Sequence, residues 1–527
     1  MIFAGLLGLC LLQGPVSPVE TPDPIEFLVL GKQQCFRLGL SVELDGSSLG
    51  AAWKNALHEL FADLDLNGDG SLDRAEAARA PGALRLRQLG WSYLFAVPKS
   101  APWDQLDVDH DGRVSFAEFL TYYRRHGLGL PIVGVGQFAP TAKLNEALLK
   151  QLSHDKTGQV SRDEWIRADK ILAAIDADQD EMIRPDEILA RTPYPGSLGG
   201  LALVPPVIGQ PQPRLLHELL LLSLPADRLD AGWAKVWMAR RGRTNELSIA
   251  RSGLSPSLGQ ALDRNGDGKL DEQELLAWRN IPPEVNRNIG ISKHGPTVTS
   301  AEVKDSPNDA VLSVHGDVHL IVHVVPGRLP EEWAKAKEVA LQRFQQADAN
   351  HDGFVDKLES AKINYAPLRD HFQFADRDGN GKISRDEWEN YLRLRGALVA
   401  CQVHITVLDS GPSLFEALDS DADGALSVRE LRGAWQRLEK LGCITAGKLD
   451  LTKLPRRIRF VVSLGPPVSL LRRVPREGPA WFVAMDRNND GDVSRREFLG
   501  DEAAFRKLDT DGDGLISRAE AEKGRVP

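Results

Sequence analysis

Hydrophobic and polar positions follow one pattern many times along the chain. In residues 263–274, DRNGDGKLDEQE, an oxygen-bearing side chain stands at every second position until a Gly, and an apolar residue follows soon after. The same 12-residue pattern starts at Asp65, Asp107, Asp348, Asp376, Asp419, Asp486 and Asp509. The eighth residue is apolar in every copy, namely Leu72, Val114, Leu270, Val355, Ile383, Leu426, Val493 and Ile516. This position predicts a short strand that pairs with a second copy.

An aromatic residue stands four positions before seven of the eight copies, which predicts a helix that enters each segment and buries one face. These residues are Phe61, Trp103, Phe344, Phe372, Phe415, Phe482 and Phe505. The copy at Asp263 has Gly259 instead. Core packing is the expected role of the aromatic residues.

The spacing of the oxygen atoms suits a hard divalent cation. Ca²⁺ takes six to eight oxygens at about 2.3–2.6 Å, and a 12-residue loop supplies them from positions 1, 3, 5, 7, 9 and 12. Gly268 stands at position 6, where the chain must turn with a positive φ, and Asp271 at position 9 is placed to act through water. The alternative is a solvated turn rich in Asp and Asn, which the repetition of the whole pattern disfavours.

The pattern resembles the loop of the EF-hand superfamily. In its Leu-, Arg- and Gly-rich connecting segments, the chain is similar to large exported multi-EF-hand proteins of bacteria. The resemblance implies paired helix–loop–helix units that bind about eight Ca²⁺ ions. The candidate ligands are Asp65, Asn67, Asp69, Ser71 and Glu76; Asp107, Asp109, Asp111, Arg113 and Glu118; Asp176, Asp178, Asp180, Met182 and Glu187; Asp263, Asn265, Asp267, Lys269 and Glu274; Asp348, Asn350, Asp352, Phe354 and Glu359; Asp376, Asp378, Asn380, Lys382 and Glu387; Asp419, Asp421, Asp423, Ala425 and Glu430; Asp486, Asn488, Asp490, Asp492 and Glu497; Asp509, Asp511, Asp513, Leu515 and Glu520. The seventh residue of each loop would bind through its backbone carbonyl.

Two copies of the pattern are weaker. The loop at Asp176 has Glu181 in place of the Gly, so we predict binding with a reduced affinity from a strained turn. The loop at Ser153 has neutral Ser153 and Thr157 at positions 1 and 5, so we predict a structural role for it.

A separation of 23 residues between neighbouring loops indicates two further copies, which start at Arg240 and Gly442 and lack most ligands. We interpret them as loops without a metal, with chance alignment as the alternative. The chain then has twelve loops, predicted to pair as 65 with 107, 153 with 176, 240 with 263, 348 with 376, 419 with 442, and 486 with 509.

Alternating hydrophobic runs lie between the loops, at residues 27–44, 318–325, 401–408 and 457–464. They predict short strands in small sheets that brace adjacent pairs, within a mainly α array of paired EF-hands. The predicted divisions are a candidate signal or anchor segment at 1–20, a β-prone segment with the first pair at 21–130, the second pair at 131–200, the third at 201–290, a strand with the fourth pair at 291–396, a strand with the fifth at 397–465, and the sixth pair at 466–527.

The first residues, MIFAGLLGLCLLQG, form an apolar run without a basic residue before Lys32. This run predicts export to the cell envelope or medium, although an export signal normally starts with basic residues. Lipid attachment at Cys10, a buried apolar segment and a cytoplasmic location are the alternatives. The remaining hydrophobic runs are too short to span a membrane, so no transmembrane span is expected in the mature chain.

Other chemistry is weakly indicated. His315, His319 and His323 stand at even spacing, for which we favour the polar edge of a strand over a transition-metal site. Basic segments such as 239–243, 455–459 and 471–476 are interpreted as solvated helix and strand ends, because a chain of 527 residues with a net charge of −10 does not favour nucleic acid as a partner.

No motif of a known catalytic class is present, so we expect no enzyme, or less favourably an enzyme regulated through EF-hands. The expected function is multi-site calcium binding in a structural, adhesion or buffering role, with an unidentified protein or cell-surface partner. A calcium sensor is the alternative, which the content of only 4 Met disfavours.

Overall fold

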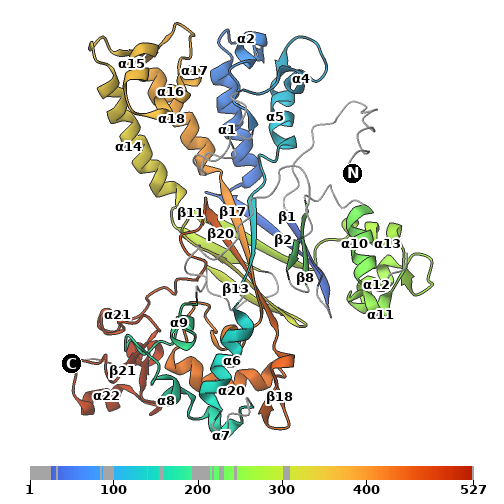
Figure 1. The fold of residues 1–527 in the computed structure, drawn as a ribbon, viewed down its shortest axis with the longest axis vertical. Coiled ribbons are helices and arrows are strands. Elements are labelled where there is room, and N and C mark those ends of the chain that lie inside the picture. The colour runs from blue at the N-terminus through green and yellow to red at the C-terminus, as the bar shows by residue number, and fades with distance from the viewer. Residues whose placement is uncertain are drawn as a thin grey trace, which may run out of the picture.

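Two β-sheets form the centre of the molecule, and helical units lie at both ends and on one side (Figure 1). The structure, a computed structural model, describes residues 25–30, 34–83, 86, 100–138, 140–153, 159–192, 214–216, 219–224, 231–241, 246–300 and 309–524. The candidate signal segment at residues 1–20 lies outside the described residues. Among the helices of the described residues, none is both long enough and apolar enough to cross a bilayer.

The first sheet has seven strands from three distant parts of the chain. They are β1 (Ile25–Leu30), β2 (Cys35–Leu44), β3 (Ser47–Ser48), β7 (Arg214–Leu216), β8 (Leu219–Leu224), β11 (Val285–Ser292) and β12 (Gly295–Thr299), in the order β12-β11-β2-β1-β8-β7, with β3 paired to β2. Strand β11 runs parallel to β2, whereas the other pairs are antiparallel.

The second sheet has five strands in the order β13-β14-β20-β17-β6. They are β6 (Ile132–Gln137), β13 (Ala310–His315), β14 (Val318–Val324), β17 (Val403–Pro412) and β20 (Arg456–Leu464). Strands β14 and β20 pair in parallel, as do β17 and β6. The prediction of a mainly α array with small sheets is therefore wrong, because 42% of the described residues are helical and 24% are in strands, and the β-prone runs pair across distant parts of the sequence.

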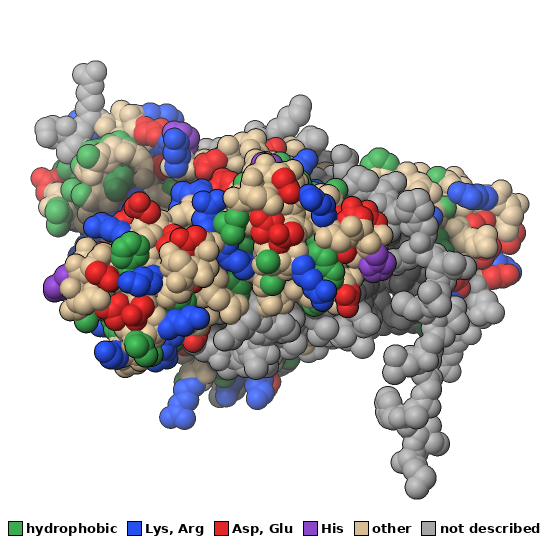
Figure 2. Space-filling model, turned by 90° about the horizontal axis from the view of Figure 1, so that it is seen from above, with side chains coloured by type: hydrophobic (Ala, Val, Ile, Leu, Met, Phe, Trp, Pro, Cys, Tyr) green, Lys and Arg blue, Asp and Glu red, His purple; other side chains and the backbone are tan. Residues whose placement is uncertain are grey.

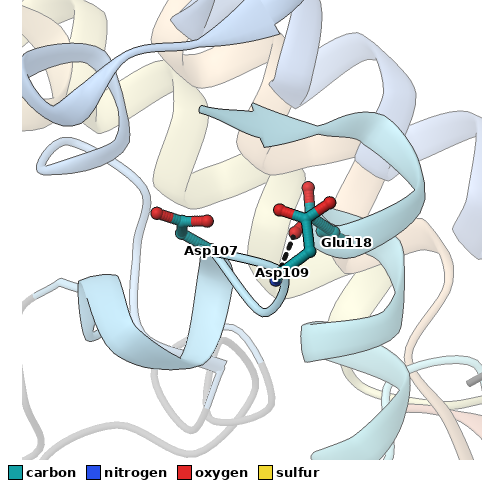
Figure 3. A group of neighbouring side chains, drawn as sticks. All are labelled: Asp107, Asp109 and Glu118. Carbon is teal, nitrogen blue, oxygen red and sulfur yellow. Dashed lines mark hydrogen bonds between the residues drawn. The ribbon is translucent and has the colours of Figure 1, made fainter. Parts of the chain in front are cut away.

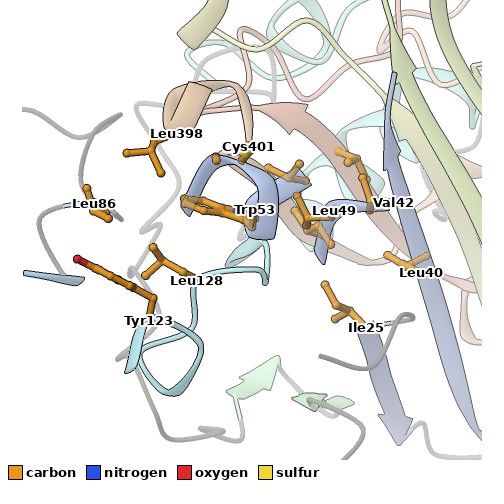
Figure 4. Packing of buried hydrophobic residues seen from close by; sticks show 14 of the residues in the cluster. Ile25, Leu40, Val42, Leu49, Trp53, Leu86, Tyr123, Leu128, Leu398 and Cys401 are labelled. Atoms are coloured by element: carbon orange, nitrogen blue, oxygen red, sulfur yellow. The ribbon is translucent and has the colours of Figure 1, made fainter. Parts of the chain in front are cut away.

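The main hydrophobic core lies between the two sheets. Ile458, Phe460 and Val462 alternate along β20 and contribute to this core, and Phe27 of β1 meets Phe460 edge to face with 5.0 Å between ring centroids. Helix α1 (Leu49–Leu64) extends the core with Leu49 and Trp53, which lie between β2 and the end of α18 (Arg385–Ala400), as Figure 4 shows. The intervening residues of β20 point to the opposite face, because side chains alternate along a strand.

Four helical units have the predicted loop pairing, because the eighth residues of their two loops meet in a short antiparallel bridge. The bridges join Leu72 with Val114, Leu247 with Leu270, Val355 with Ile383, and Val493 with Ile516. The first unit contains α1, β4 (Ser71–Leu72), α2 (Arg74–Ala77), α4 (Trp103–Leu106), β5 (Val114–Ser115) and α5 (Phe116–Arg125). The unit at Asp263 contains α10 (Ala231–Arg241), β9 (Leu247–Ser248), α11 (Ile249–Ser252), α12 (Pro256–Leu262), β10 (Lys269–Leu270), α13 (Glu272–Leu276) and η3 (Ala277–Asn280).

The other two of these four units lie in the C-terminal half. The unit at Asp348 and Asp376 contains α14 (Leu329–Ala347), β15 (Phe354–Asp356), α15 (Lys357–Lys362), α16 (Ala366–Asp370), α17 (Phe372–Ala375), β16 (Lys382–Ser384) and α18. The last unit contains α21 (Ala480–Met485), β21 (Asp492–Ser494), α22 (Glu502–Leu508), β22 (Leu515–Ser517) and α23 (Arg518–Lys523).

The remaining four loops combine in one unit, and their predicted pairing is wrong. Ile183 and Leu426 exchange backbone hydrogen bonds of 3.0 and 2.9 Å, so the loop at Asp176 pairs with the loop at Asp419. The backbone N–H of Leu449 donates to the carbonyl of Val160 at 3.0 Å, which joins the segments at Ser153 and Gly442. A spacing of 23 residues suits both the predicted pairing and the observed one. The parallel pairing of β6 with β17 selects the observed one, because it brings the chain segment that follows β6 next to the segment that follows β17.

This cross-paired unit contains α6 (Thr141–Leu152), α7 (Arg162–Trp165), α8 (Ala168–Leu172), α9 (Pro185–Ile188), α19 (Leu414–Leu418), α20 (Val428–Lys440), β18 (Ile444–Thr445), β19 (Lys448–Leu449) and η4 (Leu451–Lys453). Polar side chains fix the contact between its two halves. The hydroxyl of Thr141 donates to the carbonyl of Ser410 at 2.6 Å, and the amide oxygen of Asn145 accepts from the N–H of Leu414 at 2.8 Å.

The histidine prediction of a polar strand edge is wrong in two respects, because β14 is buried along its whole length between β13 and β20 and because the three histidines do not share one strand. His315 ends β13, whereas His319 and His323 belong to β14 beyond the intervening turn, so the three residues do not share one strand. His323 is fully buried, and its Nε2 lies 3.2 Å from the carbonyl oxygen of Leu470. The metal-binding groups of the described residues contain no histidine. Burial lowers the pKa of His323 to about 3 and that of His319 to about 4.

Acid is expected to destabilise the protein through His323. The unfolded chain takes up a proton at this histidine near pH 6.5, whereas the folded chain does so only near pH 3, so stability is complete above pH 6.5 and falls below it. The loss is about 1.4 kcal/mol per pH unit for one such group. Urea unfolding at pH 7, 6 and 5 measures the free energy of unfolding of the wild type and of His323→Leu. The difference between the two should become smaller as the pH falls. The same series with exposed His294→Leu is the control, and a constant difference for His323→Leu would contradict the prediction.

Candidate calcium sites

Each complete loop begins where its entering helix ends. The N–H of Asp65 donates to the carbonyl of Phe61 at 3.0 Å, and the first residues of the loops at positions 107, 263, 348, 376, 419, 486 and 509 make the same bond to the residue four positions earlier. Seven of the eight residues whose carbonyls accept this bond are the aromatic residues of the predicted pattern. The exception is Gly259, where close packing leaves no room for a side chain. A Cβ there would lie 2.4 Å from Cγ2 of Ile249, which belongs to the neighbouring segment at Arg240.

The first and sixth loop residues hold the loop closed. The N–H of the sixth residue donates to Oδ2 of the first aspartate at 2.9–3.2 Å in nine loops, including the loop at Asp176. The eight glycines at this position have φ between +77° at Gly268 and +88° at Gly424, a conformation that glycine adopts without steric cost.

The last loop residue, Glu, is held with both oxygens directed into the loop. In all nine loops, Oε1 accepts from the N–H of the second loop residue and Oε2 from the N–H of the ninth. For Glu118 these distances are 3.0 Å from Val108 and 2.9 Å from Ser115. Two carboxylate oxygens in one fixed orientation are what bidentate binding of Ca²⁺ requires.

In five loops the first, third and twelfth residues bring carboxylate oxygens within 4.8 Å of one another. These groups are Asp107, Asp109 and Glu118; Asp176, Asp178 and Glu187; Asp376, Asp378 and Glu387; Asp419, Asp421 and Glu430; Asp509, Asp511 and Glu520. Figure 3 shows the first group, with Asp107 at the end of α4 facing Asp109 and Glu118. The loops at Asp65, Asp263, Asp348 and Asp486 have asparagine at the third position and the same loop hydrogen bonds.

One carboxylate oxygen in several loops is available for a cation. Oδ1 of the first loop residue is buried and accepts no hydrogen bond in five loops, those starting at Asp107, Asp376, Asp419, Asp486 and Asp509. Leaving such a buried oxygen without a partner costs about 1–3 kcal/mol, and more for a charged group. Because every side-chain ligand of these loops is an oxygen, the residues fit Ca²⁺.

The loop at Asp419 is the most deeply buried, and arginines of β20 surround it. The guanidinium of Arg459, which is fully buried, lies 3.3 Å from Asp419 and 2.8 Å from Glu416, and it donates to the carbonyl of Ala422 at 2.8 Å. Arg457 donates to the carbonyl of Asp419 at 3.0 Å. Burial raises the pKa of Asp419, although Arg459 opposes this shift.

Sequence reasoning missed these arginines, and the interpretation of residues 455–459 as a solvated strand end is wrong. The signal was present in the alternation of RRIRFVVSL, because Arg457, Arg459 and Val461 share the face of β20 opposite to Ile458 and Phe460. Arg472, from another predicted solvated segment, is also buried and forms an ion pair with Asp309 at 2.9 Å. What the sequence did not reveal is the acidic partner of each arginine.

The loop at Asp176 has the predicted strain. Glu181 adopts φ of +67° and donates its N–H to Asp176 at 2.9 Å, as glycine does in the other loops. The guanidinium of Arg184, at the ninth position, forms ion pairs with Asp178 at 3.1 Å and Asp180 at 2.5 Å. Arg184 therefore competes with a metal for two of the predicted ligands. Of the loop at Ser153, residues 154–158 lie outside the described residues.

Replacing Arg184 with serine is expected to raise the calcium affinity of the Asp176 loop about threefold to tenfold, because two partly exposed ion pairs no longer compete with the ion. The calcium concentration that protects residues 176–187 from hydrogen exchange measures this affinity. Arg162→Ser, at an exposed arginine of α7, is the matched control. An unchanged midpoint in Arg184→Ser would show that the arginine does not oppose binding.

The two vestigial loops differ. In the segment at Arg240, residues 242–245 lie outside the described residues, but Leu247 makes the predicted bridge to Leu270. The segment at Gly442 forms a hairpin in which β18 pairs with β19, rather than an EF loop, and it keeps the link to the segment at Ser153 through the hydrogen bond from Leu449 to Val160 and the bridge of Lys448 with Ser161.

Comparison with known families identifies this type of unit. The model described as "EF hand" matches residues 57–76, 104–121, 260–277, 341–359, 413–433, 480–499 and 502–520, and the model described as "EF-hand domain" matches residues 367–397. The chain therefore contains multiple EF-hand domains and is a calcium-binding EF-hand protein. The segments at Ser153, Asp176, Arg240 and Gly442 lie outside the matched ranges.

Among named proteins, the chain is similar to two vertebrate proteins over a limited segment. It is 31% identical over 133 residues to "Guanylyl cyclase-activating protein 1" of Gallus gallus, which covers 24% of this chain and 66% of the relative. It is 31% identical over 119 residues to the protein of the same name in Lithobates pipiens, which covers 21% of this chain and 58% of the relative. The chain thus spans less than two thirds of either relative. Comparison with solved structures gave no significant match.

Proposed function

We propose that this protein binds calcium at eight or nine loops and that the bound ions stabilise its fold, in a structural or buffering role. The observation that carries the proposal is the buried Oδ1 atom without a hydrogen-bond partner in five loops. Calcium would supply the missing partner in the folded state only, and a ligand that binds the folded state alone stabilises it.

The position of the loops supports a structural role. The Asp419 loop is bonded to the central sheet through Arg459, and Arg429 of α20 reaches Asp492 of the last unit at 2.6 Å. Asn488 of that unit donates its side-chain amide to the carbonyl of Asp180 at 2.9 Å. Loops from three parts of the chain thus meet, and Asp492, Asn488 and Asp180 in these contacts are themselves candidate ligands, so filling the loops would hold the units together.

Calcium titration of the full chain by calorimetry, with far-UV circular dichroism on the same samples, tests the proposal. A gain of ordered secondary structure on binding is expected. A chain that has the same spectrum and the same melting temperature with chelator and with calcium would overturn the structural role. Native mass spectrometry gives the number of ions, and fewer than six or more than ten would contradict the set of loops assigned here.

A calcium sensor is the second candidate, because the relatives' names state that those proteins activate a guanylyl cyclase. Sensor EF-hands open a Met-rich apolar groove on binding, and this chain has 4 Met. On the described part of the end that carries α2, α4, α15 and α17, Figure 2 shows charged side chains of both signs among scattered hydrophobic ones. A strong calcium-dependent increase in the fluorescence of a hydrophobic dye would favour the sensor over the structural role.

We further propose that the protein is exported and has no catalytic activity. The apolar run at residues 2–12 supports export, and the millimolar calcium outside cells would fill even weak loops. Cell fractionation with mass analysis of the mature N-terminus tests the location. Recovery of the intact chain in the cytoplasm alone would contradict export.

A further inference from the structure

Two EF-hand units far apart in the sequence lie side by side. Helix α1, which enters the loop at Asp65, packs beside α18, which leaves the loop at Asp376, at the same end of the molecule (Figure 1). The contact brings the loop at Asp376 next to the loop at Asp65 of the first unit. Polar side chains from each of these two units reach the other.

In one direction, the crossing residue is Arg79. It stands three residues after Glu76, the last ligand of the Asp65 loop, and two residues after α2 ends. One guanidinium nitrogen donates to the carbonyl of Asp376 at 3.0 Å, and the other donates to the carbonyl of Arg377. These carbonyls belong to the first two residues of the partner loop. Arg79 therefore fixes the backbone at the point where that loop begins.

In the other direction, two side chains reach Asp63, which stands two residues before the Asp65 loop. Nε of Arg377 donates to the carbonyl of Asp63 at 3.2 Å and lies 3.1 Å from its carboxylate. The amide of Asn390 donates to the same carboxylate at 2.7 Å. Asn390 follows Glu387 by three residues and so occupies the same place in its hand as Arg79 does in the first. The two contacts thus start from the equivalent position of each hand, although Arg79 binds the backbone of its partner loop and Asn390 binds the side chain of Asp63 before it.

We propose that the loops at Asp65 and Asp376 form one coupled pair of sites, in which calcium at either loop raises the affinity of the other. Calcium bound by both oxygens of Glu76 fixes the start of α2, and α2 positions Arg79 on the backbone of Asp376. Calcium at Asp376 fixes that loop and, through Arg377 and α18, the end of α1 before Asp65. Each ion thereby orders a group on which the other loop depends. The inference rests on the proposed binding of calcium at both loops.

Coupling between two sites is reciprocal, so each ion must change the affinity of the other site by the same factor. Arg79 and Arg377 are positioning residues in this scheme, because neither supplies a side-chain ligand. The bridges Leu72–Val114 and Val355–Ile383 already couple the loops within each unit. The new contact extends this coupling from one unit to the other.

A double-mutant cycle in the full chain tests the coupling. The calcium midpoint for protection from hydrogen exchange is measured separately for residues 65–76 and 376–387. Glu76→Gln, which removes calcium from the first loop, is expected to raise the midpoint of the second loop about fivefold or more. In an Arg79→Gln background, the same change should shift that midpoint by less than twofold. Arg343→Gln removes an exposed charge from α14 of the same unit, outside the measured residues 376–387, and is the matched control.

The reverse cycle guards against a variant that fails to fold. Glu387→Gln should raise the midpoint of residues 65–76 by the same factor, and Asn390→Ala should reduce that effect. Equal midpoints for the second loop with and without Glu76→Gln would overturn the coupling. If Glu76→Gln shifts the calcium midpoint of residues 376–387 equally in the Arg79→Gln background, Arg79 does not transmit the coupling. If neither loop responds to calcium at any concentration, calcium binding itself fails, which is a separate outcome.

Discussion

Replacing Arg459 with glutamine is expected to lower the free energy of unfolding by about 3–5 kcal/mol, the usual cost of breaking a buried ion pair from one side. The guanidinium, Glu416 and Asp419 are all fully buried, so the variant would remove one positive charge from a site where two carboxylates are shielded from water; of the cationic groups near Glu416, Arg457 would stay at 3.5 Å. Urea unfolding monitored by far-UV circular dichroism, in excess calcium, measures the loss.

Two comparison variants separate the ion pair from general effects. Arg473→Gln, at an exposed arginine, should change stability by less than about 0.5 kcal/mol. The double variant Arg459→Gln/Glu416→Gln should recover part of the loss, because one of the two carboxylates that pair with Arg459 is gone. A loss below about 1 kcal/mol in Arg459→Gln alone would mean that water reaches this site.

Removing calcium is expected to lower the free energy of unfolding by about 4 kcal/mol for each loop whose dissociation constant lies a thousandfold below the free calcium concentration. The physical reason is that the buried Oδ1 atoms, which accept no hydrogen bond within the loops, lose the calcium ion as their partner. Thermal unfolding in chelator and in millimolar calcium measures the difference as a fall in melting temperature.

Magnesium is the control for this experiment. It demands tighter octahedral geometry and loses water reluctantly, so it should restore much less of the melting temperature than calcium does. Equal recovery by the two ions would show that charge neutralisation alone stabilises the loops. A melting temperature that is the same in chelator and in calcium would contradict the prediction.

The loops could be predicted from the sequence because their structure is local. Within twelve residues, the first aspartate, the glycine at position 6 and the glutamate at position 12 determine the hydrogen bonds, and the structure forms these bonds wherever the pattern is complete. Even the weak loop at Asp176 follows them, with Glu181 forced into the left-handed conformation. Backbone bonds over such short separations need no information from the rest of the chain.

The sheets could not be assembled from the sequence, although several strands were predicted. The run at 457–464 corresponds to β20, but nothing in its alternation identifies β14 and β17 as its neighbours. The partner of a strand depends on packing between segments hundreds of residues apart, and many apolar strands have compatible patterns. For the same reason the two loop pairs at residues 153–187 and 419–453 were assigned to the wrong partners, and Arg459 was placed in solvent.

The sheet topology also determines when the protein can fold during synthesis. Strand β6 pairs only with β17 among the described strands, so residues 132–137 must wait until residues 403–412 have been made. Each complete calcium loop, in contrast, closes within its own segment. Loops can therefore form as soon as they emerge, whereas the sheets depend on contacts between distant segments, which form slowly. The exposed apolar strands are open to aggregation in that interval, and early folding of the EF-hand units would shorten the length of chain that remains unfolded.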